Sequence, residues 1–171
     1  MEVKEVTNVF LERASHFKDE TSEFEVTRFE KVIGFKLPND YRNFLLNYRG
    51  GFLGEALIYD FIENGENTIG GIESIYGFCE NKDNSLYKYY KDYCDDYKRM
   101  MLGMIPIGDD GSGNYICLLL AKKDFGKIYF WDHEWEVDFN DPEESQEAFR
   151  NCHWIADSFT EFTKSIRIYE E

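Results

Sequence analysis

Residues 33–51 read IGFKLPNDYRNFLLNYRGG and contain the strongest structural signals in the chain. Gly34 is a natural C-terminal cap for a preceding helix, because glycine adopts the left-handed conformation without strain. Pro38 stands where a first helical position would be, since the missing N–H of proline needs no partner there. The apolar residues that follow recur at helical spacing until the pair Gly50-Gly51, which predicts a third helix. These apolar residues are Tyr41, Phe44, Leu45 and Tyr48.

Two further helices are predicted before this stretch. Apolar residues at spacings of three and four predict an amphipathic helix from Val3 to Phe17. Ser22 and Glu25 have the spacing of a capping box, so a second helix is predicted from Ser22 to Gly34.

The middle of the chain changes to strand patterns. Residues 56–62 are β-branched and aromatic and precede Asn64-Gly65, which predicts a hairpin, and residues 69–78 are expected to continue the sheet. A helix is predicted from Ser85 to about Arg99, and we interpret its stripe of tyrosines as core.

The second half is predicted to form an antiparallel meander followed by a closing helix. The expected strands are Met104–Ile107, Tyr115–Leu120 and 127–133. Ser158 and Glu161 can form a capping box for the last helix. Helices segregated around a mainly antiparallel sheet predict the α+β class, with residues 1–171 in a single domain.

Composition argues against nucleic-acid-binding, exported and membrane-spanning classes of protein. The 171 residues include 34 acidic and 19 basic ones, a formal net charge of -15, so no direct contact with nucleic acid is expected. The N-terminus lacks a signal-peptide pattern, and no apolar run is long enough to span a membrane. The four cysteines are irregularly spaced, which favours reduced thiols and a cytoplasmic location.

The sequence shows no catalytic, metal or cofactor constellation. The segment Asp109–Asn114 lacks the ligand spacing of a calcium loop and the basic residue of a phosphate loop, so a tight turn is expected at Gly111 and Gly113. His133 lies between two acids, but neighbouring residues on a strand point to opposite faces, and we expect it to be structural. No enzymatic activity is expected.

The stretch Tyr129–Phe139 alternates aromatic or apolar residues with acids and would present one acidic face if it were extended. Eight acidic residues and no Lys or Arg occur between Ile128 and Phe149. Two interpretations remain open: a charged strand edge that prevents aggregation, or a platform for a basic protein.

Four blocks resemble the SUKH superfamily (SMI/KNR-like) in its order: residues 30–51, 105–118, 127–134 and 155–162. The chain departs from the family pattern at Asn114, where aspartate is usual, and at 141–154, which looks divergent. The resemblance implies the SUKH fold. The residues that it marks as structural are Glu30, Gly34, Leu37, Pro38, Tyr41, Gly50, Gly51, Gly111, Gly113, Trp131, Phe159 and Phe162.

The resemblance also implies a function. It predicts an immunity protein that binds and neutralises a cognate bacterial toxin, in this family often a nuclease. The acidic composition adds the expectation that the toxin is basic, and the cysteine pattern that the location is cytoplasmic. The alternative is a non-enzymatic regulatory or scaffold protein of the cell-wall assembly regulator type. The residues expected to contact the partner are Asp109, Asp110, Asp132, Glu134, Trp135, Glu136, Asp138, Asp141, Glu143 and Glu144.

Overall fold

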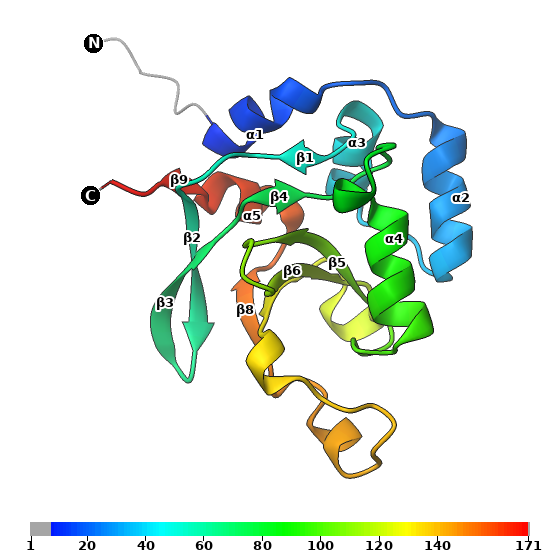
Figure 1. Ribbon diagram of the computed structural model, residues 1–171, viewed down its shortest axis with the longest axis vertical. Coiled ribbons are helices and arrows are strands. Elements are labelled where there is room, and N and C mark those ends of the chain that lie inside the picture. The colour runs from blue at the N-terminus through cyan, green and yellow to red at the C-terminus, as the bar shows by residue number, and fades with distance from the viewer. Residues whose placement is uncertain (1–7, 171) are drawn as a thin grey trace.

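The computed structural model describes residues 8–170, which form helices around two antiparallel sheets (Figure 1). The larger sheet has the order β1-β4-β5-β6-β7-β8 and the smaller one the order β3-β2-β9. The predicted α+β class and the meander β5-β6-β7 are confirmed. The helices are α1 (Val9–Ala14), α2 (Glu23–Ile33), α3 (Asn39–Asn47), α4 (Leu86–Tyr90) and α5 (Phe159–Ser165). The strands are β1 (Gly51–Phe52), β2 (Leu57–Glu63), β3 (Glu66–Gly71), β4 (Ser74–Ile75), β5 (Met104–Asp109), β6 (Tyr115–Leu119), β7 (Ile128–Trp131), β8 (Cys152–Ala156) and β9 (Arg167–Ile168).

Helix α2 begins and ends where the sequence predicts. The Ser22 side chain accepts a hydrogen bond from the Glu25 backbone N–H, and the Glu25 carboxylate accepts one in return from the Ser22 backbone. Gly34 ends the helix in the left-handed conformation, with φ of 76°. Pro38 lies at the N-cap of α3, one position earlier than predicted.

A buried carboxylate ties α2 to α3. Glu30 is only 5% exposed, and its Oε1 accepts a hydrogen bond of 3.0 Å from the Leu37 backbone N–H. The Lys36 ammonium lies 2.8 Å from Oε2, and Arg42 Nε lies 3.7 Å from Oε1. Burial alone would raise the pKa of Glu30, but the hydrogen bonds from Lys36 and Leu37 and the charges of Lys36 and Arg42 outweigh it, so the pKa is lowered.

The glycine pair after α3 lies where two backbones approach closely. Gly50 has φ of 85°, and a Cβ at this position would lie 2.5 Å from the Gly77 backbone nitrogen. A Cβ at Gly51 would overlap the ring of Phe17. Both positions therefore exclude a side chain, which accounts for the paired glycines.

The helices and both sheets enclose one aromatic core. Phe44 of α3 packs against Phe159 of α5 with ring centroids 5.1 Å apart, and Tyr41 packs against the same ring at 5.0 Å. Phe162 of α5 contacts Tyr59 of β2 at 5.5 Å, which joins the helices to the smaller sheet. Trp131, at the end of β7, is 1% exposed.

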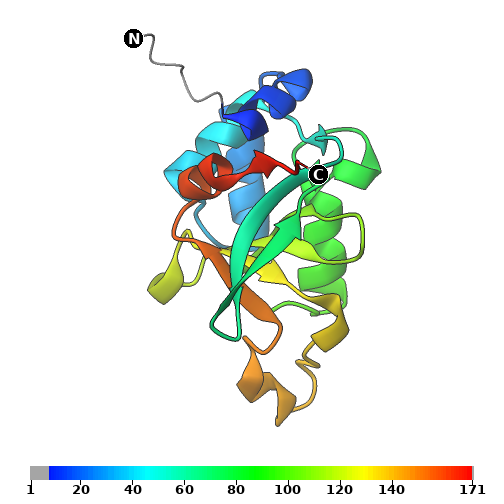
Figure 2. The ribbon, with the colours of Figure 1, turned by 90° about the vertical axis from the view of Figure 1, so that its left-hand side faces the viewer.

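The hairpin β2–β3 crosses the end of the larger sheet (Figures 1 and 2). Its turn has positive φ at both Asn64 and Gly65, as predicted from that dipeptide. Phe61 of β2 stacks on Phe130 of β7, with ring centroids 4.5 Å apart and planes inclined by 16°. The tip of the hairpin is thereby held beside β8.

Several predicted boundaries are wrong because tertiary packing overrides local pattern. The first helix is only α1 followed by a 3₁₀ turn, Ser15–Phe17, and the predicted residues Val3 and Val6 lie outside the described residues. The predicted helix from Ser85 continues beyond α4 as a π-helical segment, Lys91–Asp96, and stops before Arg99. The predicted strand 69–78 is divided between β3, β4, the loop that joins them and the loop that follows β4.

The tyrosine stripe of that helix is only partly core. Tyr89 stacks on the buried Tyr76, with ring centroids 3.9 Å apart, and the Tyr115 hydroxyl donates to the Tyr93 hydroxyl at 2.7 Å. Tyr97 departs from the prediction, because it is 68% exposed. In residues 8–170, no helix has the length and apolar character that crossing a membrane requires.

The role of Glu30 predicts a pH-dependent stability. We expect Glu30→Gln to lower the free energy of unfolding at pH 7 by about 2 kcal/mol, because Lys36 and Arg42 lose the buried negative charge with which they pair. A lowered folded-state pKa stabilises the fold above the unfolded-state pKa of about 4.3, and this contribution is lost as pH falls through the folded-state pKa. The deficit in urea unfolding should therefore shrink below about pH 4, and an equal deficit at both pH values would contradict this role.

Two glycines with positive φ provide a matched test of close approach. Gly34 has open space where a methyl group would lie, whereas Gly50 faces the backbone of Gly77. We expect Gly34→Ala to cost about 1 kcal/mol, from backbone strain alone, and Gly50→Ala to cost about 3 kcal/mol, from strain and overlap together. Thermal and urea unfolding measure both, and equal costs would show that the contact with Gly77 relaxes freely.

Candidate functional site

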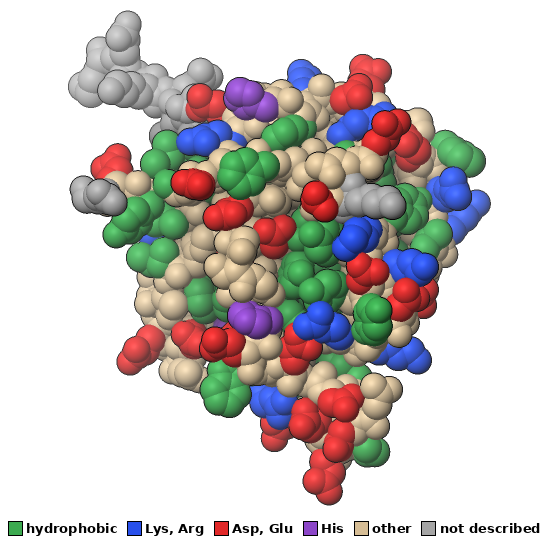
Figure 3. Space-filling view, viewed as in Figure 1, with side chains coloured by type: hydrophobic (Ala, Val, Ile, Leu, Met, Phe, Trp, Pro, Cys, Tyr) green, Lys and Arg blue, Asp and Glu red, His purple; other side chains and the backbone are tan. Residues whose placement is uncertain are grey.

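The segment 132–150, which we call the acidic lobe, joins β7 to β8 and projects from the body of the molecule at the bottom of Figure 1. It contains eight carboxylates and one arginine, Arg150. Figure 3 shows Asp and Glu side chains gathered over this projection. The lobe is therefore the most acidic protruding surface in that view.

The lobe begins with a turn and not with the predicted extended strand. Strand β7 ends at Trp131, and residues His133–Trp135 form a 3₁₀ turn. Asp132 causes this change. Its Oδ1 accepts a hydrogen bond of 2.8 Å from the Glu134 backbone N–H, and in an extended strand that N–H would not face the Asp132 side chain. The prediction of one alternating acidic face over Tyr129–Phe139 is wrong beyond Trp131.

Two arginines hold the lobe in shape. The Arg99 guanidinium makes a two-pronged contact with the Glu136 carboxylate and lies over the Tyr93 ring, 4.5 Å from its centroid. Arg150 donates to the Glu144 carboxylate at 2.9 Å and to the backbone oxygen of Glu136 at 2.7 Å. Arg150 thus links two points of the lobe that are eight positions apart in sequence.

The remaining lobe carboxylates are directed to solvent. Glu134, Asp138, Asp141 and Glu143 are exposed, whereas Glu136 and Glu144 are half-buried in the ion pairs with arginine. Asp141 accepts hydrogen bonds from the backbone N–H groups of Glu143 and Glu144, which fixes its position without neutralising its charge. The lobe therefore displays ordered negative charge.

Large aromatic side chains accompany this charge. Trp135, at the end of the first lobe turn, is 63% exposed. Phe149 is 45% exposed, and its ring packs against Tyr129, with centroids 5.6 Å apart. Tryptophan is enriched at the energetic centres of interfaces, so the exposed Trp135 is the candidate anchor residue of the lobe.

The two aspartates of the β5–β6 turn are engaged within the turn. Asp109 accepts from the Tyr76 hydroxyl at 2.5 Å and from the Gly111 backbone, and burial raises the pKa of Asp109 in spite of these bonds. Asp110 accepts from the Ser112 backbone N–H at 2.8 Å. Gly111 and Gly113 have φ of 74° and 102°, as their predicted place in a tight turn requires.

The departure from the family pattern at Asn114 has a local reason. Asn114 Nδ2 donates to Asp110 Oδ2 at 2.7 Å, where an aspartate would oppose a second carboxylate. Its Oδ1 accepts from the His133 backbone N–H at 3.2 Å and lies 2.7 Å from His133 Nδ1. Asn114 therefore fastens the β5–β6 turn to the beginning of the acidic lobe.

One convergence was missed by the sequence reasoning. Glu63, Asp132 and His153 come from β2, the start of the lobe and β8, and each offers a ligand atom within 4.8 Å of the other two. Sequence patterns indicate such sites when the ligands are close together in the chain, and these three are far apart. The adjacent groups Asp132-His133-Glu134 and Cys152-His153 each contain one of the three ligands, but neither indicates the other or Glu63.

The cysteines are free thiols in environments that disfavour ionisation. Burial raises the pKa of Cys94 and of Cys152 to about 12 and that of Cys117 well above its ordinary value. The Cys117 sulfur lies 3.8 Å from the Met100 sulfur. A thiol that stays protonated is a poor nucleophile and metal ligand, so these three act as core residues.

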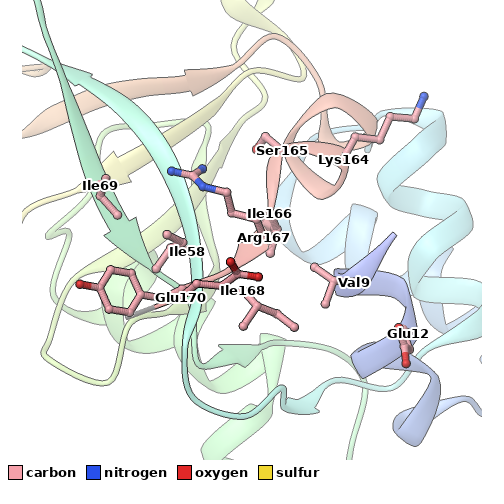
Figure 4. Close-up of a pocket in the computed structure, with 11 residues that line it drawn as sticks. Val9, Glu12, Ile58, Ile69, Lys164, Ser165, Ile166, Arg167, Ile168 and Glu170 are labelled. Atoms are coloured by element: carbon pink, nitrogen blue, oxygen red, sulfur yellow. The ribbon is translucent and has the colours of Figure 1, made fainter. Parts of the chain in front are cut away.

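A groove of about 910 Å³ lies at the other end of the molecule, between α1, the smaller sheet and the C-terminal segment (Figure 4). Val9, Ile58 and Ile168 give it an apolar floor, and Glu12 and Lys164 stand at its margin. No residue that the sequence predicts as partner-binding lines this groove.

Five described helices around a mainly antiparallel sheet define an α+β protein of the SUKH type. The model of the SMI1 / KNR4 family (SUKH-1) matches residues 20–165, and the chain belongs to this family. It is also similar to the SPbeta prophage-derived uncharacterized protein YokK of Bacillus subtilis (strain 168). The two are 33% identical over 157 residues, which cover 83% of this chain and 72% of that protein.

The hydrogen bonds of Asn114 predict a charge-specific defect. We expect Asn114→Asp to lower the free energy of unfolding by about 1–2 kcal/mol, because the new carboxylate meets Asp110 and the amide donor is lost. The double variant Asp110→Asn/Asn114→Asp exchanges donor and acceptor and should recover part of the loss. Urea unfolding at neutral pH measures both, and an Asn114→Asp chain as stable as the wild type would contradict the proposed contact.

Proposed function

We propose that this chain is an immunity protein that binds a cognate toxin through the acidic lobe and neutralises it without catalysis, in the cytoplasm and as a single domain. Family membership supports the role, because SUKH resemblance implies immunity proteins of this kind. The observation that supports this location of the binding surface is the ordered negative charge of the acidic lobe. A basic partner is proposed because a protruding surface with this charge attracts it electrostatically.

The shape of the lobe supports a direct block of the partner. A nuclease presents a basic groove to the phosphates of its substrate, and an acidic projection carries charge of the same sign as those phosphates. Glu134, Asp138, Asp141 and Glu143 would meet the cations of such a groove. The toxin is therefore proposed to be a basic nuclease, with its substrate groove covered by the lobe.

Aromatic contacts are proposed to supply the stability of the complex. Charge at the rim of an interface mainly raises the association rate, whereas buried aromatic anchors lower the dissociation rate. Trp135 is well placed for this role, because it is exposed and follows directly on Glu134. Its burial on binding would remove from water the most exposed large apolar side chain of the lobe.

The rest of the proposed surface surrounds this anchor. Asp132 and the ion-paired Glu136 and Glu144 lie in the lobe itself. Asp109 and Asp110 lie in the β5–β6 turn, which Asn114 fastens to the lobe. We propose that these side chains contribute mainly by shaping the lobe, since at least one oxygen of each carboxylate already accepts a hydrogen bond within the chain.

The alternative role is a non-enzymatic regulatory or scaffold protein. Such a protein would bind several partners with modest affinity, whereas an immunity protein would bind one partner tightly. Co-expression with the product of the adjacent gene separates the two roles. Rescue of growth and tight co-purification would support neutralisation, and the absence of both would favour the regulatory role.

The acidic lobe predicts a salt-dependent association with that partner. We expect association to slow about tenfold when ionic strength rises from about 50 mM to about 300 mM. The variant Glu134→Gln/Asp138→Asn/Asp141→Asn/Glu143→Gln should slow association about tenfold at low salt, with a smaller change in dissociation. Stopped-flow mixing measures both rates.

The matched control removes the same charge elsewhere. Glu20, Glu55, Glu66 and Glu80 are exposed and lie outside the lobe, and replacing all four with glutamine should change the association rate far less. Equal slowing in the two quadruple variants would show that net charge, and not the lobe, steers the partner. A salt-insensitive association rate would contradict electrostatic steering altogether.

A further inference from the structure

Three potential metal ligands converge beside the acidic lobe. Glu63, Asp132 and His153 each offer one ligand atom, and these atoms all lie within 4.8 Å of one another. His153 Nε2 lies 3.9 Å from Glu63 Oε1. Ligand atoms bound at about 2.0–2.2 Å to one tetrahedral ion are about 3.3–3.6 Å apart, so rotation of the two carboxylates toward His153 would complete a shared site.

The fold holds the histidine in place. His153 is on β8, directly opposite Phe130 of β7, and its side chain is only 14% exposed. Its ring packs against Phe61 and Phe130, with centroid distances of 5.8 and 6.1 Å. The imidazole is therefore positioned by the same aromatic stack that holds the hairpin against the larger sheet.

The two carboxylates reach the histidine from different elements of the fold. Glu63 is the last residue of β2, two positions after Phe61, so the two side chains lie on one face of the strand. Asp132 is held at its backbone by Asn151, which donates from Nδ2 to the Asp132 oxygen at 2.9 Å. The hydrogen bond from the Glu134 backbone uses Oδ1 of Asp132, which leaves Oδ2 able to bind a metal ion.

Charge and chemistry together indicate the kind of ligand. A protonated imidazole would balance one of the two carboxylates, whereas a divalent cation balances both and accepts the neutral imidazole as a ligand. Imidazole nitrogen favours first-row transition metals over Mg²⁺ and Ca²⁺, which prefer sites made of oxygen. Three protein ligands also leave at least one coordination position to water or a partner group.

We propose that Glu63, Asp132 and His153 form a binding site for a divalent transition-metal ion, with Zn²⁺ as its best probe. An ion bound there joins the tip of the β2–β3 hairpin to β8 and to the first residue of the acidic lobe. Binding therefore fixes the lobe relative to the sheets. The site shares Asp132 with the proposed toxin surface, but Zn²⁺ binding requires no partner protein and is therefore tested separately from toxin binding.

The test uses the full chain, stripped of metal with EDTA and titrated with ZnCl₂ by calorimetry. We expect one Zn²⁺ per chain and a higher thermal unfolding temperature, because an ion that binds only the folded state stabilises it. Glu63→Gln, Asp132→Asn and His153→Gln should each weaken binding at least about tenfold. Glu63→Gln is the most informative of the three variants. Glu63 is half-exposed at the hairpin tip and the least involved in packing, so its replacement disturbs the fold least.

Matched controls remove similar groups nearby. Glu66 is exposed and pairs with Glu63 across the hairpin, and His133 follows Asp132 directly. Glu66→Gln and His133→Gln should bind Zn²⁺ within about twofold of the wild type. The proposal is overturned if the wild type binds no Zn²⁺, if the three site variants retain its affinity, or if the controls lose as much as they do.

Discussion

The carboxylate of Glu30 connects the end of one helix to the beginning of the next, and much of the packing depends on that connection. Burying a charge is costly unless donors surround it, and here the Leu37 backbone, Lys36 and Arg42 supply them. The bond to Leu37 sets the direction in which the chain enters α3. That direction places the aromatic face of α3 against α5 and, through α5, against β2, so a local ion pair helps to set how these helices meet the smaller sheet.

The elements that the sequence predicts well are those specified by neighbouring residues. The capping box of Ser22 and Glu25, the end of α2 at Gly34 and the Asn64-Gly65 turn each depend on a few adjacent side chains. Elements that need a distant partner were missed. Strand β8 begins in the segment 141–154, which diverges from the family pattern, and it is a strand because it pairs with β7. The short strands β1 and β9 likewise exist only through pairing with β4 and β2.

The same distinction applies to the candidate site. Its charge is visible in the sequence, because counting acids requires no structure. Its conformation is not visible, because alternation suggests a strand whereas Asp132 captures the backbone of Glu134 and ends it. The clamp of Arg99 on Glu136 joins residues 37 positions apart and has no sequence signature. The convergence of Glu63 with His153 depends on the path of a hairpin across a sheet, which local patterns do not specify.

The contacts of Arg150 make the lobe a closed unit. By bonding both the Glu136 backbone and the Glu144 side chain, Arg150 fixes the two ends of the intervening loop within the lobe itself. The six strands behind it take no part in that closure. Val137 is buried at 3% exposure, but residues 138–143 beyond it are thus free to change in identity, and even in number, while the scaffold keeps its fold. Divergence between relatives can concentrate in this loop, so that recognition evolves separately from folding.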